Sequence, residues 1–494
     1  MRSGLSIIKA LLALTIIGLS ACSAPQEDDI RFGLSRAPIN LDPRFATDAA
    51  SSRINRLIYD RLVDFDNAYR AVPALARWQK LSDKTYRFTL TKTPRFHSGE
   101  PLTAYDVKAT YDSVLAADTA SPHRAGLAVI DNISVSNDKT LTFHLKQADL
   151  LFPGRLVIGI LPKSALETNH AFNRSPIGSG AFAFISWPEE GILKLKRRRD
   201  GQRLSLIEVK NPTVRVLKLL RGEIDMLQND LPSELTAYLK TQPQVELMKG
   251  RGSNFTYLGF NLEDDATSDL KLRKAIAHAL NRQEIIRYVM GDAAVPASAL
   301  LPPDHWAGLQ LPLYTYDPEK ARALLKEAGY GDEKRPQLVY KTSSDPFRVR
   351  LATVIQKQLD DVGIDVDLRS YDWGTFYGDI KAGRFQMFSL SWVGIKTPDI
   401  FRYVFHSKSV PPNGANRGRY MDDMSDQLID SAEAASSLDG QAAYYRQLQG
   451  RLLDQLPYVP LWYEDHLFAA RNGIKGYRLA RDGNYDGLKY VTRQ

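Results

Sequence analysis

The sequence is poor in cysteine: Cys22 is the only one among its 494 residues. A lone cysteine forms no disulfide within the chain, so no disulfide framework supports the fold. The length exceeds what one hydrophobic core usually supports, which predicts two or three domains. A hydrophobic content of 44% with 25% charged residues is typical of a globular protein.

Motifs for catalysis and metal binding are also missing. No GxSxG nucleophile elbow occurs, and the SxxK match at Ser136 lies in a predicted hairpin turn, where no helix begins. The paired acids Asp264-Asp265 and Asp422-Asp423 lie in polar segments typical of caps and turns. We therefore expect no enzyme, no metal ion and no cofactor. The histidines are too far apart in sequence for a local metal motif: His97, His123, His144, His170, His278, His305, His406 and His466.

A concentrated basic patch is absent as well. Lysine and arginine number 65 against 57 acidic residues, a net charge of +8 that is spread along the chain. The longest basic run, residues 194–199, alternates like a strand and is typical of a solvated sheet edge. No nucleic-acid-binding module accompanies it, so we expect no nucleic acid partner.

Long apolar runs are lacking except at the N-terminus. Arg2 and Lys9 precede an apolar run over residues 10–19, which is too short to span a bilayer and is typical of a signal peptide. Leu19-Ser20-Ala21-Cys22 resembles the lipobox of bacterial lipoproteins. The resemblance predicts cleavage before Cys22, lipidation of its sulfur, and a polar tether over residues 23–29.

The rest of the chain alternates strand and helix signals. Helices are predicted from the capping box at Thr103, over residues 270–286, and after the Asp-Pro starts at 317 and 345. Strands are predicted at 30–34, 86–90, 364–368 and 458–463, and the aromatic strand 255–261 is a candidate to cross between lobes. The glycine-rich turn at 176–182 lacks the lysine of a phosphate loop and is interpreted as structural.

Residues 369–401 form the stretch around which the chain is organised. A helix is predicted after Asp372, followed by a turn at Gly383 and a strand that places 385, 387 and 389 on one face. At Ser391-Trp392-Val393-Gly394 the regular periodicity is expected to end. An aromatic ring followed by glycine indicates a binding loop. The alternative, that Trp392 only fills a core, stays open on this pattern.

These landmarks, read in order, resemble the extracytoplasmic solute-binding proteins of ABC transporters, family 5, the peptide, dipeptide and nickel class. The matching segments are Leu41-Asp42-Pro43, 58–63, 96–106, 176–182, 222–225, Asn261 with 272–276, 317–329 and 389–401. The resemblance covers nearly the whole predicted mature chain.

The resemblance implies an α/β, two-lobed, type II periplasmic-binding-protein-like fold with an extra α+β domain in the first lobe. Its implied divisions are a signal peptide at 1–22, a sheet domain of lobe 1 at 23–58 and 161–255, the extra domain at 59–160, lobe 2 at 256–465, and a C-terminal return to lobe 1 at 466–494.

The same resemblance places a ligand between the lobes. Peptide binders similar to this chain carry an aspartate for the ligand amine where Ile395 stands, and some carry an arginine for the ligand carboxylate where Ser389 stands. Lys396 and Asp399 offer alternative charges or structural salt bridges. The expected ligand-binding residues are Ile39, Asn40, His123, Trp373, Ser389, Ser391, Trp392, Val393, Gly394 and Ile395.

The expected function is a lipid-anchored, extracytoplasmic, monomeric binding protein. It captures a peptide or peptide-like solute between closing lobes and delivers it to an ABC permease and its ATPase subunits. Two alternatives remain: a carrier for a non-peptide solute such as a metal chelate or oligosaccharide, which the apolar Ile395 suits, and an exported envelope hydrolase on the same scaffold.

Overall fold

The computed structural model describes residues 29–494, except 92, 189–190 and 332. The predicted signal peptide and Cys22 therefore lie outside the described residues. Within the described part of the chain, no helix combines the length and the apolar character needed to cross a bilayer.

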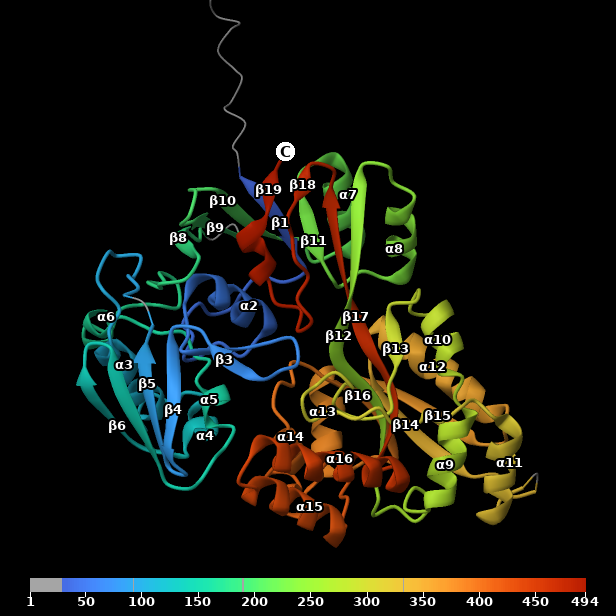
Figure 1. Cartoon of the computed structure of the whole chain (residues 1–494). Helices are drawn as coiled ribbons and strands as arrows, with labels where there is room; N and C mark the ends of the chain where they lie inside the picture. Colours follow the sequence, from blue (N-terminus) through green and yellow to red (C-terminus); the bar gives the residue numbers. More distant parts are fainter. Residues whose placement is uncertain (1–28, 92, 189–190, 332) are drawn as a thin grey trace, which may run out of the picture.

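One mixed sheet runs through the molecule and joins its two halves (Figure 1). Its strands lie in the order β15 (Asp365–Tyr371), β14 (Gln337–Ser343), β16 (Met387–Trp392), β12 (Val245–Phe260), β17 (Tyr458–Arg471), β11 (Met226–Gln228), β1 (Ile30–Leu34), β10 (Arg203–Glu208), β9 (Ile192–Arg197) and β8 (Phe182–Ser186), and β13 (Ala294–Pro296) pairs with β17.

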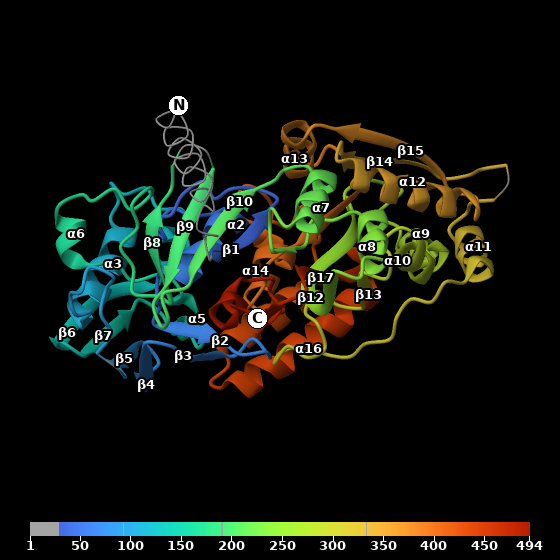
Figure 2. The ribbon, with the colours of Figure 1, turned by 90° about the horizontal axis from the view of Figure 1, so that it is seen from above.

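The long antiparallel strands β12 and β17 connect the two halves. At one end β17 pairs with β11 through residues 468–470, and at the other end β12 pairs with β16 through residues 255–260. Figure 2 shows the two strands between the β8–β9–β10 group and the helices α9–α12. The predicted strand 255–261 is the second-lobe end of β12, and the crossing includes residues 245–254, which the prediction left out. We call the β1, β8–β11 side the first lobe and the β13–β16 side the second lobe.

Three smaller sheets complete the strand inventory. The first lobe carries a separate four-stranded antiparallel sheet, beside which α3 packs (Figure 1). This is the extra α+β unit, so the predicted fold class is confirmed; the exact residue limits of the domains stay predictions. The strands are β4 (Ala76–Ser82), β5 (Thr85–Leu90), β7 (Thr140–Leu145) and β6 (Ile130–Asn137), then the pairs β2 (Val63–Phe65) with β3 (Ala71–Pro73) and β18 (Ile474–Lys475) with β19 (Thr492–Arg493).

The helices cover both lobes. In the first lobe they are α2 (Ala49–Ile58), α3 (Ala104–Leu115), α4 (Arg124–Leu127), α5 (Phe152–Arg155), α6 (Lys163–Glu167), α7 (Pro212–Arg221), α8 (Ser233–Lys240) and the 3-10 helix Asp486–Tyr490. In the second they are α9 (Leu270–Ala279), α10 (Arg282–Tyr288), α11 (Pro318–Glu327), α12 (Pro346–Asp360), α13 (Trp373–Ala382), α14 (Ile400–Phe405), α15 (Asp423–Ala434), α16 (Leu438–Gln455) and the 3-10 helix Ser407–Ser409.

Local capping explains why many of these helices begin where the sequence predicts. The Asp106 carboxylate accepts from the Thr103 backbone N–H at 2.7 Å, which completes the capping box of α3. The Asp345 and Asp372 side chains accept backbone N–H groups at the starts of α12 and α13. A Cβ added to Gly178 would lie 2.0 Å from the Ile58 carbonyl oxygen, so the turn at 176–182 is structural, as predicted.

Two predicted elements differ in the structure. The single helix expected over 270–286 is two helices, because Leu280 is extended and the Asn281 side chain caps α10 by accepting from the Glu284 backbone N–H at 3.1 Å. The aromatic strand expected at 458–463 continues to Arg471, because residues 466–471 pair with the first half of β12.

The second lobe is packed on both faces of its part of the sheet. One cluster includes Leu272, Ile355 and the fully buried Trp462, and the other includes Phe388 and Phe401. Trp462 is therefore a core residue. The two clusters hold β16 between them, and this fixes where its C-terminal end emerges.

Candidate functional site

The candidate site is built at the C-terminal end of β16, beside the crossing strand β12. The strand pairs in regular register from Met387 opposite Phe260 to Trp392 opposite Phe255. The strand ends at Trp392, within the segment 391–394 where the regular periodicity is expected to end. Alternation therefore puts Ser389 and Ser391 on one face and Trp392 on the other.

The serine face is a chain of hydroxyl groups. The Tyr340 hydroxyl donates to the Ser389 Oγ at 2.9 Å. The Ser391 Oγ lies 2.6 Å from the Thr256 Oγ1, which donates to a Glu464 carboxylate oxygen at 2.9 Å. Arg348 pairs with that same carboxylate at 3.3 Å. This face is polar, and its one carboxylate already has a countercharge.

The tryptophan face is aromatic and cationic. The half-buried Trp392 ring meets Tyr403 edge-on, with 6.3 Å between ring centroids. The Arg417 guanidinium carbon lies 4.8 Å from the centre of the indole ring. Trp392 is thus packed on the core beneath it and keeps part of its surface exposed.

The residues after Trp392 make a turn at the edge of the second lobe. Val393 is 59% exposed and Gly394 has φ +73°, a left-handed conformation that favours glycine. A Cβ added to Gly394 would meet no atom within 4 Å, so the turn, and not a close contact, explains the glycine. Ile395 follows, half-buried against the second-lobe core.

Residues 396–399 then reach the first lobe through two ion pairs. The Lys396 Nζ lies 2.9 Å from Asp482, and Arg155 lies 2.9 Å from Asp399. Burial favours the neutral acid at Asp482, but the Lys396 ammonium outweighs it and lowers the pKa of that carboxyl group. Lys396 and Asp399, which the sequence offers as alternative charges or as structural salt bridges, are therefore both engaged in salt bridges between the lobes.

The first-lobe candidates lie on two neighbouring loops. The backbone N–H groups of Ile39 and Asn40 both donate to the Ser51 Oγ, at 2.8 and 3.0 Å, and the Ile39 side chain is 76% exposed. The His123 Nε2 lies 3.2 Å from the Ala46 carbonyl oxygen, and burial lowers the pKa of this histidine. In the described chain, no hydrogen bond or ion pair joins these three residues to residues 389–395.

Trp373 lies on the second lobe, at the first position of α13. Its side chain is 59% exposed and stacks on Tyr377, with ring centroids 5.3 Å apart and an interplanar angle of 8°. The Tyr377 ring in turn lies 5.4 Å from the guanidinium carbon of Arg417. Tyr377 thus links the exposed Trp373 to the cation beside Trp392.

Sequence reasoning missed Arg417. It lies between α14 and α15, and its guanidinium donates to the hydroxyls of Tyr257 at 3.3 Å and Tyr377 at 3.1 Å. Tyr257 is 160 residues away in sequence and Tyr377 is 40 away. No local sequence motif predicts such a site, because only the fold brings these groups together.

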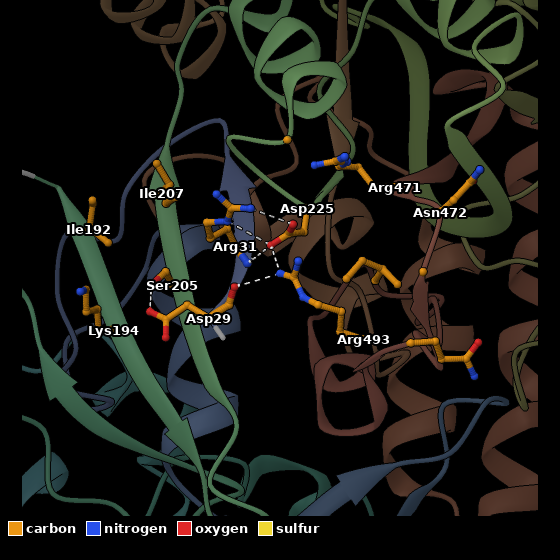
Figure 3. A pocket seen from close by; sticks show the side chains of 14 residues that line it. Asp29, Arg31, Ile192, Lys194, Ser205, Ile207, Asp225, Arg471, Asn472 and Arg493 are labelled. Atoms are coloured by element: carbon orange, nitrogen blue, oxygen red, sulfur yellow. Dashed lines mark hydrogen bonds and ion pairs between the residues drawn. The ribbon is translucent and has the colours of Figure 1, made fainter. Parts of the chain in front are cut away.

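A separate polar pocket of about 550 Å³ lies at the far end of the first lobe, next to the C-terminus (Figure 3). At its centre the buried Asp225 carboxylate accepts from the Arg31 Nη2 at 3.1 Å and the Arg493 Nη2 at 2.8 Å. Arg493 also donates to the Asp29 carbonyl oxygen at 3.1 Å. These bonds tie β19 to β1, and the pocket holds none of the predicted site residues.

Groups for catalysis or metal binding do not assemble in the part of the chain described. No set of three or more His, Cys, Asp or Glu side chains among residues 29–494, apart from the four omitted positions, is arranged to hold a metal ion. The Ser391 hydroxyl contacts Thr256, and the carboxylate beyond Thr256 is paired with Arg348. This arrangement supplies no general base to Ser391.

Comparison with known proteins identifies the family of this chain. Residues 70–412 match the family "Bacterial extracellular solute-binding proteins, family 5 Middle". The chain belongs to this family. It is 26% identical to the dipeptide-binding protein of Escherichia coli K12 over 509 residues, covering 94% of this chain and 95% of that protein.

Solved family 5 structures show the same fold. The periplasmic binding protein DppA from Helicobacter pylori, in complex with peptide STSA, has a TM-score of 0.76 and 25% identity, covering 94% of this chain and 98% of that one. NikZ from Campylobacter jejuni, in complex with Ni(L-His), has a TM-score of 0.78 and 23% identity, covering 94% and 100%.

Proposed function

We propose that this family 5 protein is the extracytoplasmic binding component of an ABC importer and captures a peptide or peptide-like solute between its lobes. The observation that carries the proposal is the pair of crossing strands β12 and β17, which join two lobes whose facing segments meet beside Trp392. A relative matched over nearly its whole length is a dipeptide-binding protein, and a structural neighbour holds a peptide.

The mechanism is capture by a population shift. A solute that contacts both lobes at once binds the closed form more tightly than the open form, so it favours closure. Two strands are a narrow connection, which allows the lobes to rotate about it. A permease that recognises the closed form then receives only loaded protein. Micromolar affinity, about 8 kcal/mol, is enough for such a carrier.

The residues of the proposed ligand site are the ones that the sequence and its family resemblance name. Ser391, Trp392, Val393, Gly394 and Ile395, with Ser389 and Trp373, would line the ligand site from the second lobe. Ile39, Asn40 and His123 would face them from the first lobe. The site carries out no bond chemistry in this proposal, because Ser391 has no base and no cofactor is required.

Localisation forms part of the same proposal. The protein would be exported, processed before Cys22 and anchored by lipid to an envelope membrane as a monomer. Replacing Cys22 with serine should abolish incorporation of labelled fatty acid and move the protein from the membrane fraction to the soluble fraction. Retention of the variant on washed membranes would contradict the lipid anchor.

The test of the function is to identify the bound solute. The chain is expressed without residues 1–22, purified gently and compared in native and denaturing mass spectra. A released peptide mixture, or uptake of a defined peptide library after refolding from urea, is the expected result. A single co-purified non-peptide species, with no uptake of the library, would overturn the peptide proposal.

A further inference from the structure

Arg417 differs from every other buried arginine in the described chain. Each of the other six donates to backbone carbonyls, to a carboxylate, or to both; Arg273, for example, donates to the carbonyls of residues 267, 268, 455 and 456. Arg417, which is 7% exposed, has only the hydroxyls of Tyr257 and Tyr377 as acceptors. The six are Arg61, Arg197, Arg215, Arg273, Arg282 and Arg419.

The charge of Arg417 is therefore held by neutral groups. Burial lowers the pKa of Arg417, but the phenolic oxygens of Tyr257, Tyr458 and Tyr377 raise it by more than burial lowers it. The guanidinium therefore stays charged. The faces of Trp392 and Tyr377 add cation–π attraction. Of the five N–H donors of a guanidinium, these two hydroxyls account for two, and no carboxylate of the described chain pairs with it.

The surrounding carboxylates are already neutralised. Glu464 is paired with Arg348, Asp399 with Arg155 and Asp482 with Lys396. Beside Trp392, the buried Arg417 guanidinium is therefore a positive charge that no carboxylate of the described chain neutralises. A ligand amine would find the carboxylates Glu464, Asp399 and Asp482 already paired, whereas a ligand carboxylate would find a planar guanidinium suited to two parallel hydrogen bonds.

Position supports the same conclusion. Arg417 lies against Trp392, two residues before the turn at Gly394, and against Tyr377, which stacks on the exposed Trp373. These aromatic rings are the partly open surface of the second lobe next to its contact with the first. In the proposed site, a solute held between the lobes would lie beside this guanidinium.

We infer that Arg417 binds a carboxylate of the captured solute, and that recognition at this wall selects the acidic end of the ligand instead of its amine. The inference rests on the proposed function and names the chemistry of its ligand. Tyr257 and Tyr377 position the guanidinium, while Trp392 and Trp373 give the neighbouring part of the solute an apolar surface.

The first test changes the ligand and leaves the protein intact. An equimolar library of di-, tri- and tetrapeptides is prepared in free, N-acetylated and C-terminally amidated forms and titrated into the wild-type chain, with native mass spectrometry as the readout. We expect N-acetylated peptides to bind within about threefold of the free forms and amidated peptides to lose about 30-fold or more. Equal binding of amidated and free peptides would overturn the inference while the proposed function stands.

The second test changes the cation. Arg417→Gln should bind free and amidated peptides equally weakly, and Arg417→Lys should keep part of the preference for the free carboxylate. The matched control is Lys381→Gln, which removes an exposed cation 5.3 Å from the same Tyr377 ring. It should retain the wild-type preference, and loss of the preference in this control would overturn the assignment.

Thermal unfolding separates these outcomes from simple loss of the fold. If Arg417→Gln does not fold, the lysine variant and the amidated peptides still decide the question. A wild-type chain that takes up none of the three peptide forms would remove the proposed peptide function, and the inference would fall with it.

Discussion

Two clusters of arginine in this molecule have opposite electrostatic arrangements. In the first-lobe pocket, Arg31 and Arg493 surround the buried Asp225, and their bonds link β1 to the C-terminal strand β19. At the edge of the second lobe, Arg417 is more deeply buried than Arg31 or Arg493, but its guanidinium contacts only tyrosine hydroxyls and aromatic rings.

The difference indicates what each cluster is for. A buried charge without a countercharge is costly, so a protein that needs the charge only for stability supplies its own partner. In the Asp225 cluster the carboxylate and the two arginines are paired with each other. We therefore interpret the pocket around them as structural, despite its volume. Arg417 keeps its charge available, which is the arrangement expected of a group that meets its partner in a ligand.

The largest expected effect comes from breaking the structural cluster. Asp225→Asn leaves Arg31 and Arg493 without their anion, and since both arginines are about one-third exposed we expect a loss of about 2 kcal/mol in the free energy of unfolding. Urea unfolding followed by circular dichroism measures it. Peptide affinity should not change.

Asp367→Asn is the matched control for this substitution, because its pair with Arg369 is exposed on both sides. It should cost less than about 0.5 kcal/mol. If Asp225→Asn weakened peptide binding more than it weakened the fold, the pocket would have to be regarded as part of the ligand site.

A substitution at Ile395 tests the charge arrangement near Arg417 and Trp392. Ile395→Asp places an anion close to Trp392, at the position where the resemblance to family 5 peptide binders implies one. It should give free-amine peptides an advantage of about tenfold over N-acetylated ones, equivalent to about 1.4 kcal/mol. Isothermal titration with the two peptide forms measures the ratio. Ile395→Asn, similar in size and uncharged, should show no such ratio. No response to the aspartate would mean that the site lies elsewhere.

Sequence patterns predicted the elements whose determinants are local. The starts of α3, α12 and α13 depend on side chains within three residues of the capped N–H group, and each of them was predictable. The C-terminal half of β17 was not, because its partners at 245–250 are more than two hundred residues away and its own sequence is mixed in polarity.

The site residues also divide into those with local sequence signals and those that depend on long-range contacts. Trp392 and Gly394 stood out because a strand, an aromatic ring and a glycine are adjacent in sequence. Arg417 could not stand out, since its significance lies in what it lacks: a carboxylate or carbonyl partner, which only the fold reveals. Alternation also separated Ser391 from Trp392, once the strand proved to continue between them.

A smaller effect is expected at the salt bridge between the lobes. Lys396→Met removes the partner of Asp482 and should weaken peptide binding about fivefold, or about 1 kcal/mol, because the pair contributes to the closed form and both groups are partly buried. A double-mutant cycle with Asp482→Asn isolates the pair, and additive effects would contradict the role.

The acid dependence of that pair has a definite sign. The pKa of Asp482 is lowered in the folded chain, so the pair contributes fully above the ordinary aspartate pKa and is lost as the pH falls through the lowered value. The difference in affinity between the wild type and Lys396→Met should therefore be constant near neutrality and shrink below about pH 4.

The smallest effect isolates the backbone from the charges at the second-lobe edge. Gly394→Ala introduces no clash but forces alanine to φ +73°, so the free energy of unfolding should fall by about 1 kcal/mol. Gly378→Ala, inside α13 with equal space for a Cβ, should instead raise it by about 0.5 to 1 kcal/mol, because alanine favours the helix. If the two substitutions change the free energy of unfolding in opposite directions, Gly394 is needed for the backbone conformation of the turn after Trp392. If both substitutions lower it by the same amount, this explanation of Gly394 is contradicted.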